Sequence, residues 1–218
     1  MMIAVLTCDI IGSRFFSNKD RALLQKSIRE FFDVTCRLFP QAKADVISFR
    51  VTAGDEFQFS LLEPCYSYQF LLHLRLQTSL LKVDRMPLFR CGIGTGERSV
   101  EGQTSYEMDG TAYYRSRQAL SAISDSAVND RLTSIVTPNE QLNKYLSGLL
   151  PLLDIFENEW SMRQREFILH QMEGRNVMDT AVEIDTSHQN VSKALKTANW
   201  DEFKAGIELI QGFIKDAT

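Results

Sequence analysis

Two β-rich runs joined by a very short turn constrain this chain more than any other feature. The runs are DVISFRVT (45–52) and EFQFSLL (56–62), and only Ala53-Gly54-Asp55 separates them. Gly and Asp are residues that tight turns favour, and a connection of this length joins antiparallel neighbours. The segment therefore predicts a β-hairpin, around which the rest of the fold must be arranged.

Strand and helix patterns alternate on both sides of the hairpin. A β-rich run at 3–8 precedes an apolar-periodic helix, for which Asn18 is the expected N-cap and Pro40 the end. After the hairpin we expect a helix from Pro64 to Leu81, a strand at 87–96, a helix at 111–123, a strand at 132–137 and a helix from Pro138-Asn139. This order predicts an α/β fold with a mixed sheet and flanking helices.

The strand signal ends after Glu157. Four short helical segments follow: WSMRQREFILHQMEG, NVMDTAVEIDT, SHQNVSKALKTA and NWDEFKAGIELIQGFIK. A change from alternating strands and helices to helices alone predicts a domain boundary. We therefore expect two domains, residues 1–157 and residues 158–218, of which the second is all-α.

Charge, cysteine spacing and hydropathy narrow the function classes. The net charge of −4 gives the whole chain no attraction to phosphate backbones or anionic lipid. The four cysteines are irregularly spaced, without a CxxC, and the three histidines do not pair with them at zinc-ligand spacing. The longest apolar runs are far too short to span a bilayer and have no secretory-signal pattern. We expect a cytoplasmic protein with reduced thiols and no membrane partner.

Two acids stand at predicted strand ends. Asp9 follows the first strand and Asp55 lies in the hairpin turn. If these strands are neighbours, the carboxylates converge, and hard oxygen ligands on rigid elements suit Mg²⁺ or Mn²⁺ together with substrate phosphates. The Ile10 main chain can add a carbonyl, and Gly12 leaves room for a phosphate. The alternative is that Asp55 only forms a turn and Asp9 only ends a strand.

Four segments resemble nucleotidyl cyclases. CDIIGS resembles the metal-binding strand end of class III cyclases, and AGDEF resembles both their Gly-Asp hairpin and the GGDEF hairpin of diguanylate cyclases. PLFRCGIGTGE resembles the cyclase strand pattern Arg-x-Gly-Ile-x-Thr-Gly, and GTAYYRSRQAL (110–120) stands where the next cyclase helix does. With the C-terminal helices, the chain resembles the SatD family, which joins a cyclase-like palm to a helix-turn-helix. The resemblance implies a ferredoxin-like α+β palm.

The resemblance also implies site residues. Asp9, Asp55 and the Ile10 main chain match metal-ligand positions, whereas Glu56 is either a third ligand or merely exposed. Gly12, Gly54 and Arg90 fall in the nucleotide-binding segments. The cyclase helix carries an asparagine and, one turn later, an arginine that stabilises charge on the transferred phosphate. This chain has Tyr113 and Tyr114 but no asparagine, so Arg115 and Arg117 are the candidate phosphate contacts, or else solvated charges.

Residues 178–198 have the spacing of a helix-turn-helix. Ala181 allows close helix packing, Ile184 precedes the turn, and Val191 and Leu195 are the expected buried positions of the second helix. The outward-facing candidates for DNA contact are Ser187, His188, Gln189, Asn190, Lys193 and Lys196. However, residues 158–218 hold seven Lys/Arg against ten Asp/Glu, a net −3, whereas DNA-binding footprints are basic. The alternative is a helical bundle used for dimerisation or packing.

Three functions are compatible with these observations. The favoured one is a regulator, in which a palm that binds metal and nucleotide controls a DNA-binding helix-turn-helix. The second is an active Mg²⁺- or Mn²⁺-dependent nucleotidyl cyclase or nucleotidyltransferase. The third is an interaction module with a relic site. The resemblance to class III cyclases also implies a homodimer.

Overall fold

The computed structural model describes residues 2–45, 47–49, 55–124 and 130–217. The strands are β1 (Met2–Ile10), β2 (Ser48–Phe49), β3 (Glu56–Leu61), β4 (Phe89–Glu97) and β5 (Thr133–Val136). The helices are α1 (Asn18–Leu38), α2 (Ser67–Ser79), α3 (Thr111–Ser124), α4 (Glu140–Glu159), α5 (Met162–Met172), α6 (Val177–Glu183), α7 (His188–Thr197) and α8 (Trp200–Ala217). Short 3₁₀ turns are η1 (Ser13–Phe15), η2 (Pro40–Ala42) and η3 (Pro64–Tyr66). The succession of elements is the predicted one.

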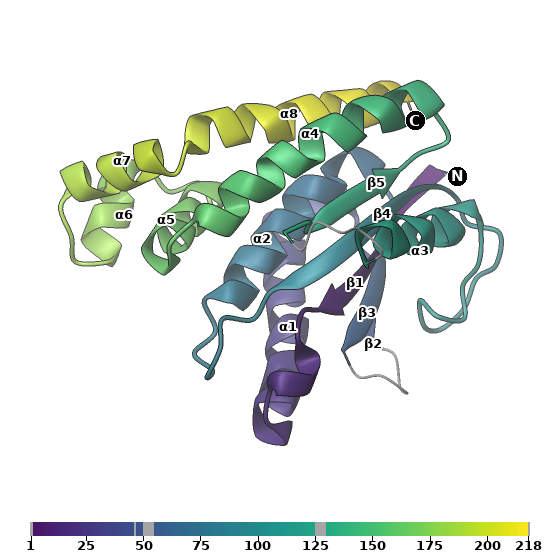
Figure 1. Ribbon diagram of the computed structural model, residues 1–218, viewed down its shortest axis with the longest axis horizontal. Coiled ribbons are helices and arrows are strands. Elements are labelled where there is room, and N and C mark those ends of the chain that lie inside the picture. The colour runs from purple at the N-terminus through teal and green to yellow at the C-terminus, as the bar shows by residue number, and fades with distance from the viewer. Residues whose placement is uncertain (1, 46, 50–54, 125–129, 218) are drawn as a thin grey trace.

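The strands form one mixed sheet in the order β2-β3-β1-β4-β5 (Figure 1). β1 pairs antiparallel with β3 and β4, whereas β5 runs parallel to β4. The predicted hairpin corresponds to the antiparallel pair β2–β3, although residues 50–54, which include Gly54 of the predicted turn, lie outside the described residues. The prediction of a mixed sheet with flanking helices is therefore confirmed.

The two faces of the sheet are covered differently. Ala4, Leu6 and Cys8 of β1 belong to the main core, which α1 and α2 cover. The alternate residues Ile3 and Val5 pack on α3, because successive strand side chains point to opposite faces. Figure 1 shows α3 in front of the sheet and α1 and α2 behind it. We call the two sides the α3 face and the α1/α2 face.

Three glycines of β4 let α3 lie directly on the sheet. A Cβ atom at Gly94 would be 2.2 Å from Ser116 N and 2.3 Å from Ala112 O, both backbone atoms of α3. Gly92 approaches the helix backbone equally closely, and a Cβ atom at Gly96 would lie 2.7 Å from Ala112 N. The RCGIGTG run is therefore a helix-packing surface in this fold, because only residues without a side chain permit this separation.

The start of α1 differs by one residue from the prediction. Ser17 is the N-cap, and its Oγ accepts a hydrogen bond from Asp20 N at 3.1 Å, whereas Asn18 is the first helical residue. Serine and asparagine are both strong N-caps, so adjacent residues of these types leave the choice open in the sequence. The helix still ends just before Pro40, as predicted.

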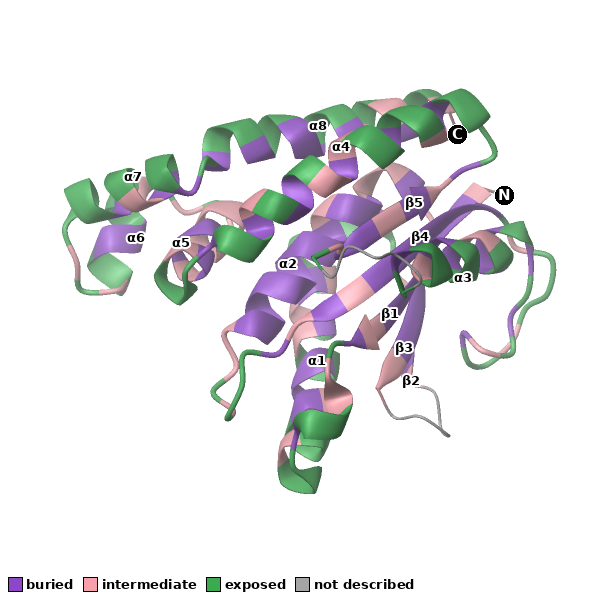
Figure 2. Ribbon diagram, in the orientation of Figure 1, coloured by how far each residue is buried: buried purple, intermediate pink, exposed green. Residues whose placement is uncertain are grey.

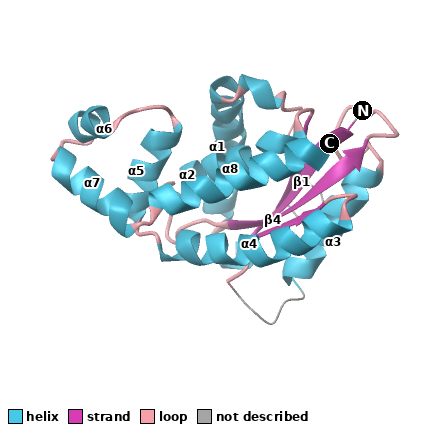
Figure 3. Cartoon of the chain, turned by 90° about the horizontal axis from the view of Figure 1, so that it is seen from above, coloured by secondary structure: helices cyan, strands magenta, loops and turns pink. Residues whose placement is uncertain are grey.

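The C-terminal helices pack onto the sheet domain through a shared core. α4 and α8 run side by side above the sheet, and α5, α6 and α7 form one end of the molecule (Figures 1 and 3). Trp160 Nε1 donates to Ala198 O at 2.8 Å, and Tyr68 of α2 stacks on Phe203 of α8 with ring centroids 6.4 Å apart. Burial continues from the strands into α4 and α8 (Figure 2). The boundary at 157/158 falls in the last turn of α4 and stays a prediction.

An ionic cluster is buried where the two parts meet. Arg75 of α2 donates to Glu157 of α4 at 2.8 Å, and Arg165 of α5 lies 3.9 Å from the same carboxylate. All three side chains are buried. Asp154 Oδ2 accepts from the backbone N–H groups of residues 132 and 133, which begin β5. The cluster thus ties α2, β5, α4 and α5 together.

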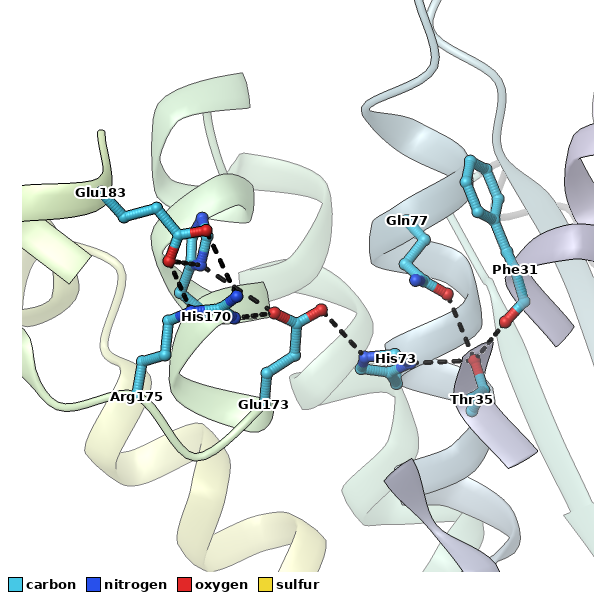
Figure 4. Close-up of polar contacts among 8 residues, drawn as sticks. All are labelled: Phe31, Thr35, His73, Gln77, His170, Glu173, Arg175 and Glu183. Carbon is cyan, nitrogen blue, oxygen red and sulfur yellow. Dashed lines mark hydrogen bonds and ion pairs between the residues drawn. The ribbon is translucent and has the colours of Figure 1, made fainter. Parts of the chain in front are cut away.

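A second polar network joins α1 and α2 to the α5–α6 turn (Figure 4). His73 is fully buried; its Nδ1 lies 2.9 Å from Thr35 Oγ1 and its Nε2 lies 3.6 Å from Glu173 Oε1. Arg175 pairs with Glu173 and, at 3.2 Å, with Glu183 of α6. The hydrogen bond to His73 and the Arg175 charge lower the pKa of Glu173, against its burial.

Within the described part of the chain, no helix is long and apolar enough to cross a bilayer.

Candidate functional site

The chain leaves β1 through a left-handed turn at Gly12. Its φ of +66° is one that residues with side chains rarely adopt. Ile11 N donates to Leu88 O at 2.9 Å, and Phe15 N donates to Gly12 O at 2.8 Å, so both sides of the turn are anchored. The turn therefore holds η1 against the end of the sheet.

Asp9 and Asp55 lie at adjacent strand ends. Ile10 N donates to Asp55 O at 3.0 Å, which joins the residue after the first acid to the second acid. Asp9 Oδ2 accepts from Arg90 Nη2 at 2.9 Å, and Asp55 Oδ2 accepts from Ser13 Oγ at 2.6 Å. The structure thus brings together the strand ends that carry both predicted ligand positions, and within the described residues each carboxylate accepts one side-chain hydrogen bond.

The pKa of Asp9 depends on burial first and on the neighbouring charged groups after it. Burial raises the pKa of the Asp9 carboxyl, and the Arg90 guanidinium opposes this shift through its hydrogen bond and charge. The negative charges of Asp55 and Glu56 raise the pKa of Asp9 further. Asp55 and Glu56 therefore lie close enough to Asp9 to act on its carboxyl electrostatically.

A cavity of about 380 Å³ opens beside Asp55, on the α1/α2 side of the strand end. We call it the phosphate pocket, after the ligand that is proposed for it below. Its lining includes Ser13, Arg14 and Arg21, with the apolar Phe16 behind them. Arg21 Nε donates to Phe16 O at 3.2 Å, which holds one guanidinium at the rim. The pocket thus presents two cationic side chains and one carboxylate to a ligand.

A hard divalent cation fits this site only together with a ligand's phosphate. No three His, Cys, Asp or Glu side chains in the described ranges are grouped to hold an ion by themselves. Two carboxylates completed by phosphate oxygens are a common Mg²⁺ arrangement in proteins. Asp9, Asp55 and the Ile10 main chain are the groups that would hold Mg²⁺ or Mn²⁺, and the ion would supply charge neutralisation for the phosphates. Their role as ligands stays a prediction.

The two candidate phosphate arginines lie at different places along α3. Arg115 Nη1 donates to Thr95 O at 2.9 Å, and Thr95 pairs with Ala4 of β1. Ala4 is five residues from Asp9, roughly 17 Å along an antiparallel strand. Arg117 is exposed and lines a second cavity that also contains Glu56. Of the two, Arg117 is the one that shares a cavity with Glu56, the register partner of Asp9.

Sequence reasoning did not single out Ser13, Arg14 or Arg21. These residues matter because they hold Asp55 or line the phosphate pocket. The sequence signal that could have identified them is a pair of arginines on either side of a helix start that follows a glycine turn. Backbone N–H groups at a helix start, together with nearby cations, favour bound anions. The ion pair between Arg90 and Asp9 was also missed, because it depends on cross-strand register.

The DNA-contact candidates occupy an exposed surface of α7. Ser187, His188, Gln189, Asn190, Lys193 and Lys196 are all exposed. Ala181, Val191 and Leu195 are buried, as the helix-turn-helix spacing predicts. Asp185, in the turn between α6 and α7, has a φ of +51°. Two helices joined by a tight turn are present, whereas a helix-turn-helix domain and DNA contact stay predictions.

Comparisons with known proteins identify one family and several solved structures of low sequence identity. A family model described as the SatD family matches residues 2–201. No curated protein matches the chain. The catalytic core of a rhodopsin-guanylyl cyclase in complex with ATPαS is 15% identical, over 53% of this chain and 70% of that chain, with a TM-score of 0.37. The monomeric guanylyl cyclase domain of the RhoGC fusion protein from the aquatic fungus Blastocladiella emersonii is 15% identical over 53% and 72%, with a TM-score of 0.38. A bacterial light-regulated adenylyl cyclase is 11% identical over 62% and 42%, with a TM-score of 0.40.

Proposed function

The chain belongs to the SatD family, whose model spans residues 2–201, and from that premise we propose a nucleotide-responsive regulator. The end of the sheet binds the phosphates of a nucleotide with Mg²⁺ or Mn²⁺, and the C-terminal helices carry the response. The observation that carries this proposal is the phosphate pocket beside Asp55, which combines Arg14 and Arg21 with a carboxylate.

The charges of the phosphate pocket suit a metal-bound polyphosphate. Guanidinium groups form strong charge-assisted hydrogen bonds with phosphate oxygens. Carboxylates repel phosphate unless a divalent cation lies between them, and Asp9 and Asp55 are the pair that would hold such a cation. A ligand with phosphate alone, or a cation alone, satisfies only half of the site. A nucleoside di- or triphosphate with its metal satisfies both halves.

Binding is favoured over catalysis because the charged groups have structural partners. Asp9 pairs with Arg90, and Arg115 is tied to the Thr95 carbonyl, away from the acids. Tyr113, which stands near the position of the cyclase asparagine, is buried and donates to Met108 Sδ at 3.1 Å. These contacts support a site that holds a nucleotide without the full set of groups for its conversion.

The network around His73 supports communication between the two parts of the chain. It runs from Thr35 of α1 through His73 and Glu173 to Arg175 and Glu183 (Figure 4). Glu183 ends α6, the helix that precedes the exposed α7. A change in α1 on ligand binding at Arg21 therefore has a continuous polar route to the α6–α7 pair.

Nucleotide titration of the purified protein tests the proposal. We expect calorimetric binding of a nucleoside triphosphate that requires Mg²⁺ or Mn²⁺. Replacing both pocket cations, Arg14→Ala with Arg21→Ala, should weaken binding by about tenfold or more. Arg37→Ala, an exposed cation at the other end of α1, is the matched control and should leave binding unchanged. Binding that is absent, or that the double variant does not weaken, would contradict the proposal.

The enzymatic alternative has its own test. Purified protein is incubated with each nucleoside triphosphate and Mn²⁺, and the products are separated by chromatography. A cyclic nucleotide or released pyrophosphate that disappears in Asp9→Ala and Asp55→Ala would establish catalysis. Turnover that survives both changes would exclude the two acids as its metal ligands.

A DNA-binding response is favoured by the exposed polar surface of α7. Gln189 and Asn190 suit adenine edges, and Lys193 and Lys196 suit phosphates. Gel-shift and genomic pull-down experiments should detect association that weakens in the variant Lys193→Ala with Lys196→Ala, but not in Lys204→Ala on α8. No association, with or without nucleotide, would leave assembly as the role of these helices.

The homodimer is also a prediction, which light scattering tests.

A further inference from the structure

The outer side of α4 carries a regular row of exposed residues. The side that faces the core holds the buried Leu142, Leu146, Leu150 and Leu153. On the opposite side, residues that alternate four and three positions apart are all exposed: Gln141, Tyr145, Gly148, Leu152, Ile155 and Glu159. We call these six residues the α4 stripe. Because this alternation is the spacing with which one helix packs along another, the stripe has the form of a helix-packing face that is open to solvent.

The middle of the α4 stripe is apolar. Tyr145, Leu152 and Ile155 are each between 50% and 57% exposed. On the neighbouring α8, Phe213 packs on Tyr145 with ring centroids 6.0 Å apart, and Leu209, one turn before Phe213, is 47% exposed. Single exposed apolar side chains are common on protein surfaces, whereas a row of them along about three turns of one helix indicates a contact surface.

The α4 stripe is complementary to itself when a second copy runs antiparallel to it. The order of its spacings is the same in both directions, so every member of the stripe meets another member. Gly148 then lies opposite Leu152 of the second copy, which places a residue without a side chain against a large one. Tyr145 lies opposite Ile155 in the same way. Large against small and aromatic against aliphatic are pairings that fill the space between two helices.

The polar end of the α4 stripe favours the same direction. Gln141 lies opposite Glu159 of the second copy, where its amide can donate to the carboxylate. Lys144, exposed beside the stripe, is close enough in sequence for its ammonium group to reach that carboxylate. In a parallel pair each residue would meet itself, so Glu159 would face Glu159 and Gly148 would leave a gap opposite Gly148. Like charges and an unfilled gap both weaken an interface.

We propose that the α4 stripe binds the α4 stripe of a second copy of this chain, antiparallel and around a two-fold axis. A symmetric pair of this kind uses the same patch on both subunits, so each contact occurs twice. α4 has 20 residues and is about 30 Å long, which is short for a stable interface, and we expect a dissociation constant in the micromolar range.

This inference goes beyond the proposed function, because it needs neither nucleotide nor DNA. It assigns a surface to the homodimer that the family resemblance implies. That surface is distinct from the sheet end that carries Asp9 and Asp55.

Sedimentation equilibrium of the full chain over a range of concentrations tests the proposal. The wild type should form a dimer that dissociates on dilution. Leu152→Glu places a carboxylate in the middle of the stripe and should raise the dissociation constant about thirtyfold or more, since a central apolar contact contributes that much to an interface. Val182→Glu, at a side chain of α6 that is 82% exposed, is the matched control and should leave the constant unchanged.

Two further changes test the fit and the direction of the helices. Gly148→Leu adds apolar surface where nothing lies within 4 Å of an ideal Cβ atom, so each subunit should keep its fold. It should still weaken the dimer about tenfold, because the new side chain meets Leu152 of the second copy. Lys144→Glu should weaken the dimer about three- to tenfold, because it faces Glu159, and adding Glu159→Lys should restore most of the loss.

The outcomes separate this inference from the proposed function. A chain that stays monomeric at the highest concentration overturns the proposal. A dimer that Leu152→Glu does not weaken keeps the homodimer but places it on another surface, which overturns the assignment to α4. A tighter dimer in Gly148→Leu contradicts the antiparallel fit. Nucleotide binding should be the same in Leu152→Glu as in the wild type, so its failure in both leaves this inference standing. Thermal unfolding verifies that each variant retains its fold.

Discussion

Arg75 shows how strongly one side chain can depend on another far along the sequence. It is fully buried and donates to Glu157, 82 residues away. Nearby carboxylates raise its pKa against the effect of burial, so the guanidinium stays charged. It also donates to Thr133 Oγ1 at 3.1 Å. A charge in this position is tolerable only while its partner is present.

The first prediction concerns the loss of that partner. Arg75→Met keeps an unbranched side chain but leaves the Glu157 carboxylate buried and facing only Arg165. Breaking a buried ion pair in this way should lower the free energy of unfolding by about 3–5 kcal/mol. Urea denaturation followed by circular dichroism measures the loss. Lys26→Met, which breaks an exposed pair at 3.7 Å on α1, should change stability by less than about 1 kcal/mol. Equal effects of the two changes would contradict the assigned role of Arg75.

Asp154 provides a pH-dependent prediction. Burial, opposed by backbone hydrogen bonds and Arg75, raises its pKa to about 6 from the usual value of 3.8. Because the folded pKa is raised, the protonated group favours the folded state, and this contribution is lost as pH rises from about 4 to about 6. The size is on the order of 3 kcal/mol. The stability of the wild type relative to Asp154→Asn should therefore fall across this range. A difference that does not change with pH would contradict the shift.

At the scale of elements, the packing of α3 on β4 gives a matched pair of glycine substitutions. A Cβ at Gly94 meets two backbone atoms of α3 within 2.3 Å, so Gly94→Ala must push the helix off the sheet. It should cost more than about 2 kcal/mol. Gly148 lies exposed within α4, with nothing within 4 Å of its ideal Cβ, so Gly148→Ala should stabilise by about 0.5–1 kcal/mol. Thermal unfolding compares the two variants. Destabilisation by both would contradict the assigned difference between the crowded Gly94 and the open Gly148.

The sequence predicted elements better than it predicted their contacts. Hydrophobic periodicity and turn residues depend on near neighbours, so the order of strands and helices follows from them. The position of α3 does not, because the close packing of its backbone on Gly94 depends on a contact between elements that are distant in the sequence. Likewise, the sequence predicted that Asp9 and Asp55 lie close together only on the assumption that their strands are neighbours. The partners of those acids, Arg90 and Ser13, depend on register and turn geometry that no local pattern encodes.

The whole molecule depends on a core that passes between the sheet and the C-terminal helices. Trp160 packs on Phe203 with ring centroids 4.6 Å apart, and Tyr68 of α2 stacks on the same phenylalanine. The buried cluster of Arg75 and the network of His73 cross the same junction. An interface with aromatic packing and buried ion pairs of this kind resembles the interior of one domain more than a contact between two.

The last prediction is that both parts unfold together. The chain's two tryptophans, Trp160 and Trp200, lie in the C-terminal helices, and the buried thiols of Cys8 and Cys91 face each other across β1 and β4. With Cys36→Ser and Cys65→Ser removing the more exposed thiols, tryptophan fluorescence and thiol labelling report the two parts separately. Their urea midpoints should coincide, because exposing either part removes core from the other. A tryptophan transition at distinctly lower urea than thiol exposure would instead support two independent domains that meet at residues 157/158.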